Sequence, residues 1–482
     1  MAALTKDEKR KMREEKELAR LKKEKARPKN KAYLWYLLLV LTLIYIIDEV
    51  TTNSVTQVED GLIATFFPNA ATNTAESYIS LLGTVSIALM IPSCFYKPLA
   101  DRYGRKVFLF INTLGMAIAM FVCFLAKNFW IYALGFCLMR WFVTPDEQVV
   151  YIVECAPKKL RGTLNSLIKG VAEFGLFLIP WFRQIFMTDT QDSNGWHQIF
   201  LVLAIIGAVI AFIALFLARE SDAFLDERIG YLSLSDEEKK ALAEQKLNNK
   251  KKQGGLLTAI VYAFKNKQLR WIFICTALYT IGRVITDRNT GIMAASWGKN
   301  SPLITQAQYI LPLGAGAITI LAGFLSDWIG RKKACIALLS SCTIFFILFV
   351  IGVQYNWNAY GIGSFLGLYL ASYWVTGDTF ILMCGESSPT NLRASLMSAQ
   401  SAFYGMGQGV SYGLAALFLA ILPSDVNLGY FCLAMALPCF IACLTLMMIK
   451  VKETKAMEIT EADRQVDQEE QAVIKSSKKE AQ

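Results

Sequence analysis

The sequence predicts an all-α membrane protein in which twelve transmembrane helices form two pseudo-symmetric six-helix bundles. Three observations predict this fold. The 482 residues are 54% hydrophobic with a mean hydropathy of +0.38, which is more apolar than an ordinary soluble protein. Most charged residues gather in three segments, 1–32, 219–270 and 450–482, so long charge-poor stretches lie between them. Short polar motifs also recur in the two halves, at offsets of 226 and 232 residues.

The elements follow in chain order. Residues 1–32 carry 13 Lys or Arg before the first apolar run, which predicts a solvated basic tail on the cytoplasmic side. Twelve apolar runs follow, and each can cross the hydrocarbon core as a helix that satisfies its own backbone hydrogen bonds. We expect these spans at 33–57, 77–97, 107–126, 129–153, 163–187, 197–218, 271–297, 302–326, 334–354, 358–384, 394–422 and 427–449.

The charged segment 219–270 divides these spans six and six. The expected domains are therefore an N-terminal bundle at 33–218, a cytoplasmic loop at 219–270, a C-terminal bundle at 271–449 and a cytoplasmic tail at 450–482. The short loops set the orientation, because basic residues favour the cytoplasmic side. Only Lys127 and Lys299 fall on one side, whereas eleven fall on the other: Lys97, Arg102, Arg105, Lys106, Lys158, Lys159, Arg161, Arg331, Lys332, Lys333 and Arg393. We therefore expect a multi-pass protein of the cell membrane with both termini in the cytoplasm.

Several classes of function are excluded by the composition. The net charge of +10 is concentrated in the first tail, so we expect no nucleic-acid partner. The 11 cysteines are scattered singly, without the spacing of a metal site or a disulfide framework. The single histidine, His197, begins the sixth span, so a histidine-based relay, metal site or nucleophilic triad is not expected. We expect no metal, no cofactor, no catalytic residue and no enzymatic activity.

Two pairs of motifs indicate an internal duplication. LADRYGRK at 99–106 recurs as LSDWIGRK at 325–332, and ECAPKKLRG at 154–162 recurs as ESSPTNLRA at 386–394. The second offset also places Asp146 in register with Asp378. The sequence therefore predicts two copies of one six-helix unit.

These motifs join acids, arginines and turn-forming glycines at the expected cytoplasmic helix ends. Glycine permits the tight turn, and the basic side chains can pair with acids on neighbouring helix ends. We predict a gate that latches this side and releases it, although the residues can instead serve only to orient the topology. The gate residues are Asp101, Arg102, Gly104, Arg105, Glu154, Arg161, Glu220, Asp327, Gly330, Arg331, Glu386 and Arg393.

The motifs resemble the signature loops of the major facilitator superfamily over roughly residues 33–456. YIVECAPKKLRG at 151–162, RESDAFL at 219–225 and KETKA at 452–456 are similar to sugar-porter motifs, whereas GESSPTNLR at 385–393 is similar to the organic-ion transporters. The resemblance implies a central cavity lined by spans 1, 4, 7 and 10. Span 7 departs from the sugar porters' QQxxGxNxxxYY pattern, so the resemblance carries no hexose site onto it.

Charged residues within the expected spans mark a solute pathway, because each is costly in hydrocarbon unless it is paired or hydrated. Arg140 can approach Glu147, and Arg283 can approach Asp287 one helical turn away. Lys169 and Glu173 can form a structural pair, and Arg183 can snorkel to the interface. The predicted substrate and proton residues are Asp48, Glu49, Arg140, Asp146, Glu147, Arg283, Asp287, Arg288, Asp378, Gln400 and Tyr404.

The sequence thus predicts a secondary active transporter for a small polar or charged organic solute: a sugar-like solute, an organic acid or an organic cation. Buried acids favour proton symport, with Asp48 as the first candidate for coupling. A uniporter or an exporter of the same fold, and a non-transporting solute receptor, are the alternatives. The expected partners are the solute, protons and the lipid bilayer, and the expected state is a monomer.

Overall fold

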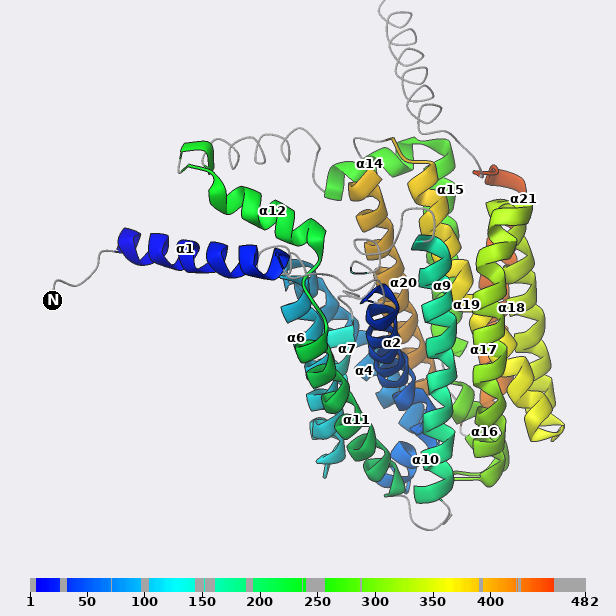
Figure 1. The fold of residues 1–482 in the computed structure, drawn as a ribbon. Helices are drawn as coiled ribbons and strands as arrows, with labels where there is room; N and C mark the ends of the chain where they lie inside the picture. The colour runs from blue at the N-terminus through cyan, green and yellow to red at the C-terminus, as the bar shows by residue number, and fades with distance from the viewer. Residues whose placement is uncertain are drawn as a thin grey trace, which may run out of the picture. The chain divides into compact units, whose positions relative to one another are not determined.

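The regular structure is helical throughout the part of the chain that the computed structural model describes (Figure 1). The helices fall into two compact units: unit 1, made of residues 1–55, 89–179 and 195–249, and unit 2, made of residues 56–88, 180–194 and 250–482. The described residues are 6–26, 33–70, 72–96, 104–143, 151, 161–187, 194–235, 237–239, 256–286, 288–389, 393–421, 423 and 426–454.

Unit 1 is built from helices of the N-terminal half. Helix α6 packs along α11 and against α7, and α1 packs on α12. The helices of this unit are α1 (Lys6–Lys25), α2 (Tyr33–Gln57, through Val55), α6 (Arg105–Phe124), α7 (Phe129–Val143), α9 (Arg161–Glu173), the 3-10 helix η2 (Phe174–Phe177), α11 (Gly195–Leu217) and α12 (Asp222–Ser233).

Unit 2 contains all the described helices of the C-terminal half, together with segments of α4 and α10 and the short helix α3. Helix α19 packs against both α17 and α18, and α15 packs against α20 and α21. The helices of this unit are α3 (Glu59–Phe66), α4 (Thr72–Tyr96, through residue 88), α10 (Leu178–Phe186, from residue 180), α14 (Leu256–Lys265), α15 (Lys267–Thr286), α16 (Asn289–Trp297), α17 (Pro302–Ile329), α18 (Arg331–Gln354), α19 (Ala359–Glu386), α20 (Arg393–Ile421) and α21 (Leu428–Lys450).

Each of the twelve expected spans overlaps a described helix or a run of consecutive helices. Seven described helices are long and apolar enough by themselves to cross a membrane. Two of the other spans are interrupted: span 5 is divided into α9, η2 and α10, and span 7 is divided into α15 and α16. Helix α15 begins at Lys267, four residues before the expected start of span 7.

Two breaks in the helices occur at related places in the two halves. The first, at Val58, separates α2 from α3, and the second, at Arg288, separates α15 from α16. Val58 and Arg288 stand 230 residues apart, which lies between the two motif offsets of the sequence repeat. Interrupted helices at matching points of two repeats are typical of transporter folds, where the freed backbone groups bind side chains or solutes.

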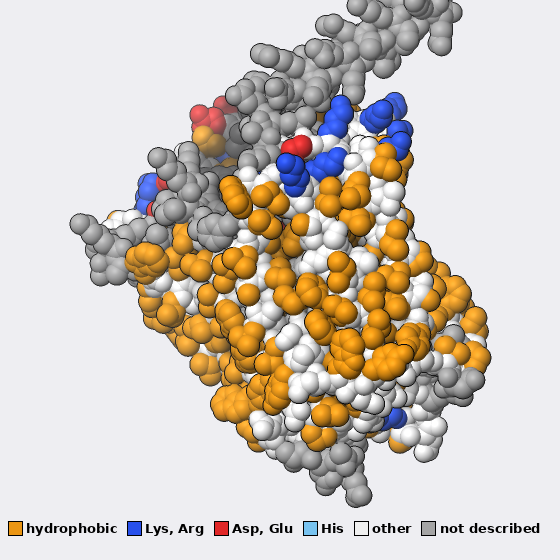
Figure 2. Space-filling model, turned by 90° about the vertical axis from the view of Figure 1, so that its right-hand side faces the viewer, with side chains coloured by type: hydrophobic (Ala, Val, Ile, Leu, Met, Phe, Trp, Pro, Cys, Tyr) orange, Lys and Arg blue, Asp and Glu red, His pale blue; other side chains and the backbone are white. Residues whose placement is uncertain are grey.

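Exposed hydrophobic side chains follow one stripe of α11. Ile205, Val209, Phe212 and Phe216 recur three or four residues apart and are 47–75% exposed, whereas the opposite stripe is buried. Figure 2 shows another face of the molecule, where hydrophobic side chains cover the middle and Lys and Arg gather at one end. Such apolar surface suits contact with lipid tails, and basic residues at one end suit the water boundary. The chain is a multi-pass membrane protein.

The basic N-terminal segment folds as helix α1 and packs on α12 in unit 1 (Figure 1). Leu21 is buried against Phe224, Leu225 and Leu232 of α12. Ion pairs flank this apolar contact, with Arg228 Nε 2.9 Å from Glu17 Oε1 and Lys239 Nζ 2.9 Å from Glu14 Oε2. The first tail, expected only to be solvated, thus has a helical partner within its own unit.

Candidate functional site

A cluster of one arginine and three tyrosines lies within unit 2, and we call it the arginine–tyrosine cluster. The guanidinium of Arg283 on α15 donates to Tyr404 Oη of α20 at 3.0 Å and to Tyr373 Oη of α19 at 3.4 Å. It also lies over the Tyr373 ring, 4.6 Å from the centroid. The Tyr373 and Tyr404 hydroxyls are 2.7 Å apart. Tyr279 stacks on Tyr373 with centroids 4.5 Å apart.

The predicted residues Arg283, Gln400 and Tyr404 are thus held along one contact between α15 and α20. Gln400 donates to Thr276 Oγ1 at 3.2 Å, and Ser411 donates to the carbonyl of Ile281 at 2.6 Å. These two hydrogen bonds hold α15 and α20 together near Arg283. The cluster joins the end of the guanidinium to hydroxyl groups, so it combines a positive charge, hydroxyl donors and aromatic faces at one place.

Other predicted pathway residues lie in both units. In unit 1, Asp48 is buried on α2, and the neighbouring Glu49 accepts from Asn53 Nδ2 at 3.3 Å. Arg140 on α7 lies over the Phe136 ring, 5.4 Å from the centroid. In unit 2, Asp378 on α19 is exposed. Asp146, Glu147 and Asp287 lie outside the described residues, and so do the expected pairings of Arg140 with Glu147 and of Arg283 with Asp287.

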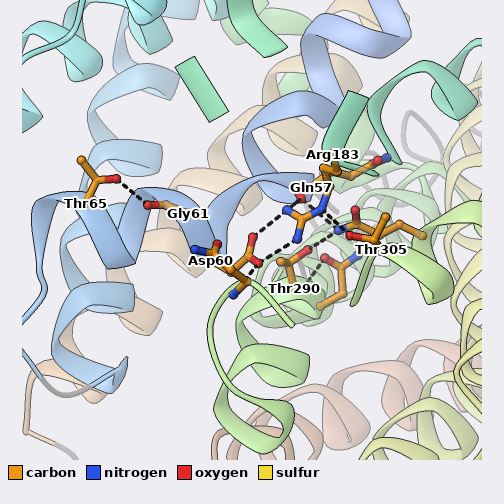
Figure 3. A network of polar contacts seen from close by, with 10 residues as sticks. Gln57, Asp60, Gly61, Thr65, Arg183, Thr290 and Thr305 are labelled. Carbon is orange, nitrogen blue, oxygen red and sulfur yellow. Dashed lines mark hydrogen bonds and ion pairs between the residues drawn. The ribbon is translucent and has the colours of Figure 1, made fainter. Parts of the chain in front are cut away.

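A buried polar network surrounds Arg183 at the end of unit 2 that holds α3, α10 and α16 (Figure 3). Arg183 makes two parallel bonds to Asp60, of 2.7 and 2.8 Å, and its exposed fraction is 1%. It also donates to the carbonyl of Gln57 at 2.7 Å, at the point where α2 ends. The expectation that Arg183 snorkels is wrong, because a two-bond contact with a buried carboxylate satisfies the guanidinium inside the protein.

Arg288 lies in a second buried ion pair near the same end. Its NH1 nitrogen is 2.7 Å from Glu59 Oε1 and 2.8 Å from Glu76 Oε2. All three side chains are at most 3% exposed. The sequence analysis singled out Arg288 but neither acid, although the run Glu59–Asp60–Gly61 directly after an apolar span was an available signal.

The expected gate motif of the first half forms a helix cap in unit 1. Glu220, which follows the sixth span, accepts from the backbone N–H of Arg105 at 2.9 Å and of Lys106 at 3.2 Å, at the first turn of α6. A carboxylate at this position accepts hydrogen bonds from the first N–H groups of the helix, and the positive end of the helix dipole stabilises its negative charge. Gly104 precedes the cap with φ +112°, and a Cβ there would lie 2.5 Å from Glu220 Oε2.

The second half repeats this cap in unit 2. Glu453 accepts from the N–H of Arg331 at 2.8 Å and of Lys332 at 3.2 Å, at the start of α18, and Gly330 has φ +103°. The Arg331 side chain pairs with Glu386 at 3.1 Å, which joins two of the predicted gate residues. The same Glu386 accepts from Thr454 Oγ1 at 2.7 Å. The duplication inferred from sequence therefore extends to a shared three-dimensional cap.

The remaining gate predictions lie outside what the structure describes. Asp101, Arg102 and Glu154 fall between the described ranges, and the side chains of Arg161, Asp327 and Arg393 are likewise not described.

Burial alters the acid–base behaviour of the cap in unit 1. Removal of the Glu220 carboxyl from water raises its pKa to about 7, although the hydrogen bonds from the backbone N–H groups of Lys106, Ser221 and Arg105 oppose this shift.

Within the described residues, no group of three or more His, Cys, Asp or Glu has the arrangement of a metal site.

A repeated bundle of apolar helices, with two spans broken at matching points and charged side chains buried between them, defines a secondary transporter of the membrane. The family model described as "Sugar (and other) transporter" matches residues 36–466. The chain belongs to this family, so it is a transporter and not an enzyme.

Similar proteins include the glucose transporter GlcP of Staphylococcus epidermidis, 23% identical over 68% of this chain and 75% of that protein. The sialic acid transporter NanX of Escherichia coli is 24% identical over 70% of this chain and 74% of its own. A stretch of 151 residues is 28% identical to Monosaccharide-sensing protein 1 of Arabidopsis thaliana, and it covers 30% of this chain but only 19% of that protein.

Solved structures share the fold. A crystal structure of a D-xylose–proton symporter has a TM-score of 0.66 at 18% identity and covers 88% of this chain and 99% of that one. A bacterial homologue of the human lysosomal transporter Spinster has a TM-score of 0.58 at 16% identity and covers 90% and 98%. At these identities the likeness establishes the major facilitator fold.

Proposed function

We propose that this chain moves a small hydroxylated organic solute across the cell membrane by alternating access, in symport with protons, with both termini in the cytoplasm. The observation that carries the proposal is the arginine–tyrosine cluster. It places a cation, two hydroxyl groups and stacked rings together on three helices of unit 2, α15, α19 and α20. Family membership supports transport, and the positive-inside pattern supports the orientation.

The chemistry of the cluster favours a sugar-like solute, and among these one that carries a carboxylate. Aromatic faces pack against the apolar face of a sugar ring, and tyrosine hydroxyls exchange hydrogen bonds with its hydroxyl groups. The Arg283 guanidinium can bind a carboxylate through two parallel bonds. The same positive charge disfavours an organic cation. The relatives' names, which include glucose, D-xylose and sialic acid transporters, span neutral and acidic sugars.

Proton coupling is assigned to Asp48. Its side chain is buried on α2, within the first span, where a carboxylate can gain and lose a proton as its access to water changes. A symporter uses such a group to bind solute and proton in one state. A uniporter or an exporter of the same fold, and a solute receptor, remain the competing functions.

A thermal-shift screen of the purified protein tests the solute class. A ligand that binds only the folded state raises the unfolding temperature. We expect sugar acids to give the largest shift, neutral sugars a smaller one and amines none. A larger shift with amines than with either sugar class would contradict the proposed substrate.

Arg283→Lys tests the role of the guanidinium in that screen. Lysine keeps the positive charge but loses the planar fork, so we expect affinity for the best sugar acid to fall about tenfold or more, with a smaller loss for neutral sugars. Arg270→Lys is the matched control, because Arg270 lies on the same helix α15, over Trp271 and away from the cluster. Equal losses in both variants would remove Arg283 from the solute site.

Asp48→Asn tests the coupling in proteoliposomes. We expect the variant to exchange solute between two sides at equal concentration but to lose accumulation driven by an inward proton gradient. Asp226→Asn, which changes an exposed acid on α12, should retain both activities. If Asp48→Asn still accumulates solute with an unchanged dependence on external pH, coupling belongs to another residue. If transport by the unmodified protein does not depend on the proton gradient, the protein is a uniporter.

A further inference from the structure

We propose that Glu59 and Glu76 form a proton-binding site in which the two carboxyl groups share one proton beside Arg288. The site lies in unit 2, between the start of α3, the first turns of α4 and the junction of α15 with α16. It is separate from Asp48 and from the arginine–tyrosine cluster. The inference concerns proton binding by the folded protein and does not depend on the proposed solute or on transport.

The first argument is a charge count. The described ion pairs at this end of unit 2 contain three acids, Glu59, Asp60 and Glu76, but two arginines, Arg183 and Arg288. Arg183 is committed to Asp60 through two parallel bonds. Arg288 alone therefore faces two carboxyl groups. If all were ionised, one negative charge would be left buried without a counter-charge, which is costly in a low-dielectric interior.

The second argument is the geometry of the pair. One nitrogen of Arg288, NH1, contacts an oxygen of each carboxyl group, so the two groups lie side by side rather than on opposite sides of the guanidinium. Their other oxygens also converge: a Cβ on Gly291 would lie 1.9 Å from Glu76 Oε1 and 3.6 Å from Glu59 Oε2. Two carboxyl groups held this close favour a state in which one proton is shared between them.

The third argument is that the surroundings offer no second base or cation among the described residues in contact with the pair. Tyr412 of α20 presents its ring to Arg288, with the guanidinium 6.0 Å from the centroid. Cys432 of α21 lies within electrostatic reach of both acids and of Arg288. The nearest acid along the chain, Asp60, is occupied by Arg183. A proton is therefore the species that balances the charge.

The shared proton gives the site a structural consequence. With the proton bound, the two acids and Arg288 hold α3, α4 and the α15–α16 junction together as a neutral group. Loss of the proton leaves an excess negative charge that repels the two carboxyl groups, and this end of unit 2 loosens. Proton binding and the packing of the two broken spans are therefore linked.

Infrared difference spectroscopy of the purified protein tests the site directly, because a protonated carboxyl group has a carbonyl band that a carboxylate lacks. We expect the spectrum of the unmodified protein at neutral pH to contain one band that disappears in Glu59→Gln and equally in Glu76→Gln. Either substitution leaves one acid for one arginine, so the remaining carboxyl group ionises. Glu173→Gln is the control, and it should keep the band because Glu173 is a buried acid of unit 1 that is not part of the pair.

A second measurement keeps the test valid if one variant does not fold. The unfolding temperature of the unmodified protein should fall at alkaline pH as the pair loses its proton, and this part of the fall should be absent in whichever glutamine variant folds. A band that persists unchanged in both variants would overturn the proposal. So would the absence of the band from the unmodified protein together with a sodium-dependent rise in its unfolding temperature, because a metal cation would then balance the charge.

Discussion

At Gly104 and Gly330 the backbone conformation decides the local structure. Each has a positive φ, which an L-amino acid with a Cβ adopts only at a cost in free energy. Each also faces the carboxylate that caps the next helix. The glycine in each GRK motif therefore serves two purposes: it permits the turn, and it leaves room for Glu220 or Glu453. This explains why the two halves share the motif.

Gly104→Ala should destabilise unit 1. The positive φ costs roughly 1–2 kcal/mol for a residue with a Cβ, and the added methyl group would displace the Glu220 carboxyl, 2.5 Å away. Thermal unfolding in detergent measures the effect. Gly230→Ala is the control: Gly230 is exposed in α12 with nothing within 4 Å, so alanine should stabilise by about 0.5–1 kcal/mol. Equal effects in the two variants would rule out this role for Gly104.

The raised pKa of Glu220 predicts a pH dependence of stability. The folded carboxyl titrates at about 7 and the unfolded one at the ordinary value of 4.5, so the folded state holds the proton more tightly. Its contribution to stability is complete below about pH 4.5 and is lost as the pH rises through about 7. The loss is at most about 3 kcal/mol.

Glu220→Gln should flatten this part of the stability curve, because the amide keeps an acceptor for the N–H groups of α6 but does not titrate. The measurement is the unfolding temperature from about pH 5 to about pH 8, a range that brackets the folded pKa of Glu220. Glu238→Gln is the control, since hydrogen bonds from Ser235 lower the pKa of Glu238 and move its titration to more acidic pH. If the fall survives in Glu220→Gln, another group is responsible.

At the scale of elements, the docking of α1 on α12 depends mainly on its apolar contacts. The ion pairs of Arg228 with Glu17 and of Lys239 with Glu14 are partly exposed, and such pairs contribute no more than about 1 kcal/mol each. Burial of Leu21 among Phe224, Leu225 and Leu232 contributes more. The basic helix is therefore held by a small core, and its ion pairs fix the register.

Leu21→Ala should release α1 from α12. The loss of a buried leucine costs about 2–5 kcal/mol, which exceeds what the flanking ion pairs supply. Limited trypsin digestion measures the release, because α1 is rich in Lys and Arg and becomes cleavable once it is undocked. Met12→Ala, at an exposed position of α1 that is not a trypsin site, should leave the digestion rate unchanged. Protection of α1 in Leu21→Ala would show that charge holds it.

Broken helices are the second feature at this scale. Val58 and Arg288 interrupt the first and seventh spans at related positions, and side chains bind backbone groups at both. At the first break the carbonyl of Gln57 accepts from Arg183 and Gln308, and at the second the N–H of Thr290 donates to Asn289 Oδ1. A helix end buried in a membrane protein needs such partners, because water is not available to supply them. Polar side chains therefore compensate for freed backbone groups at both interruptions.

At the scale of the whole molecule, we propose that the predicted cytoplasmic gate links the helix caps to transport. Arg331 contacts Glu386 and Ser326 in unit 2 and begins the helix that Glu453 caps. We expect Arg331→Ala to slow solute uptake several-fold at matched expression, while thermal unfolding changes little, because a partly exposed pair contributes about 1 kcal/mol or less. Initial rates in proteoliposomes measure this.

A double-mutant cycle separates gating from a general loss of activity. If the pair acts as one unit, Arg331→Ala combined with Glu386→Ala should be no slower than the slower single variant. Arg270→Ala is the matched control, an arginine on α15 that stacks on Trp271. Additive slowing in the double variant, or wild-type uptake in Arg331→Ala, would limit these residues to orienting the topology.

The amino-acid sequence by itself determined the class of fold, the positions of the spans and the duplication. Apolar runs have to become helices in a membrane, and two copies of a motif have to fold alike, so these features depend on local composition and spacing. The same reasoning singled out Arg283, Gln400 and Tyr404, because polar residues within an apolar span stand out, and the structure places them along one contact between α15 and α20. It also found the glycines and Glu220 of the caps, through the motifs that contain them.

Only the tertiary structure decided which charges meet. Arg183 and Asp60 are 123 residues apart, and Arg288 is 229 residues from Glu59 and 212 from Glu76. Sequence reasoning treated Arg183 as interfacial and passed over the three acids, because they lie outside or at the edges of the expected spans. Whether a charge is costly depends on its burial and its partner. Both are set by long-range packing, and no local pattern records them.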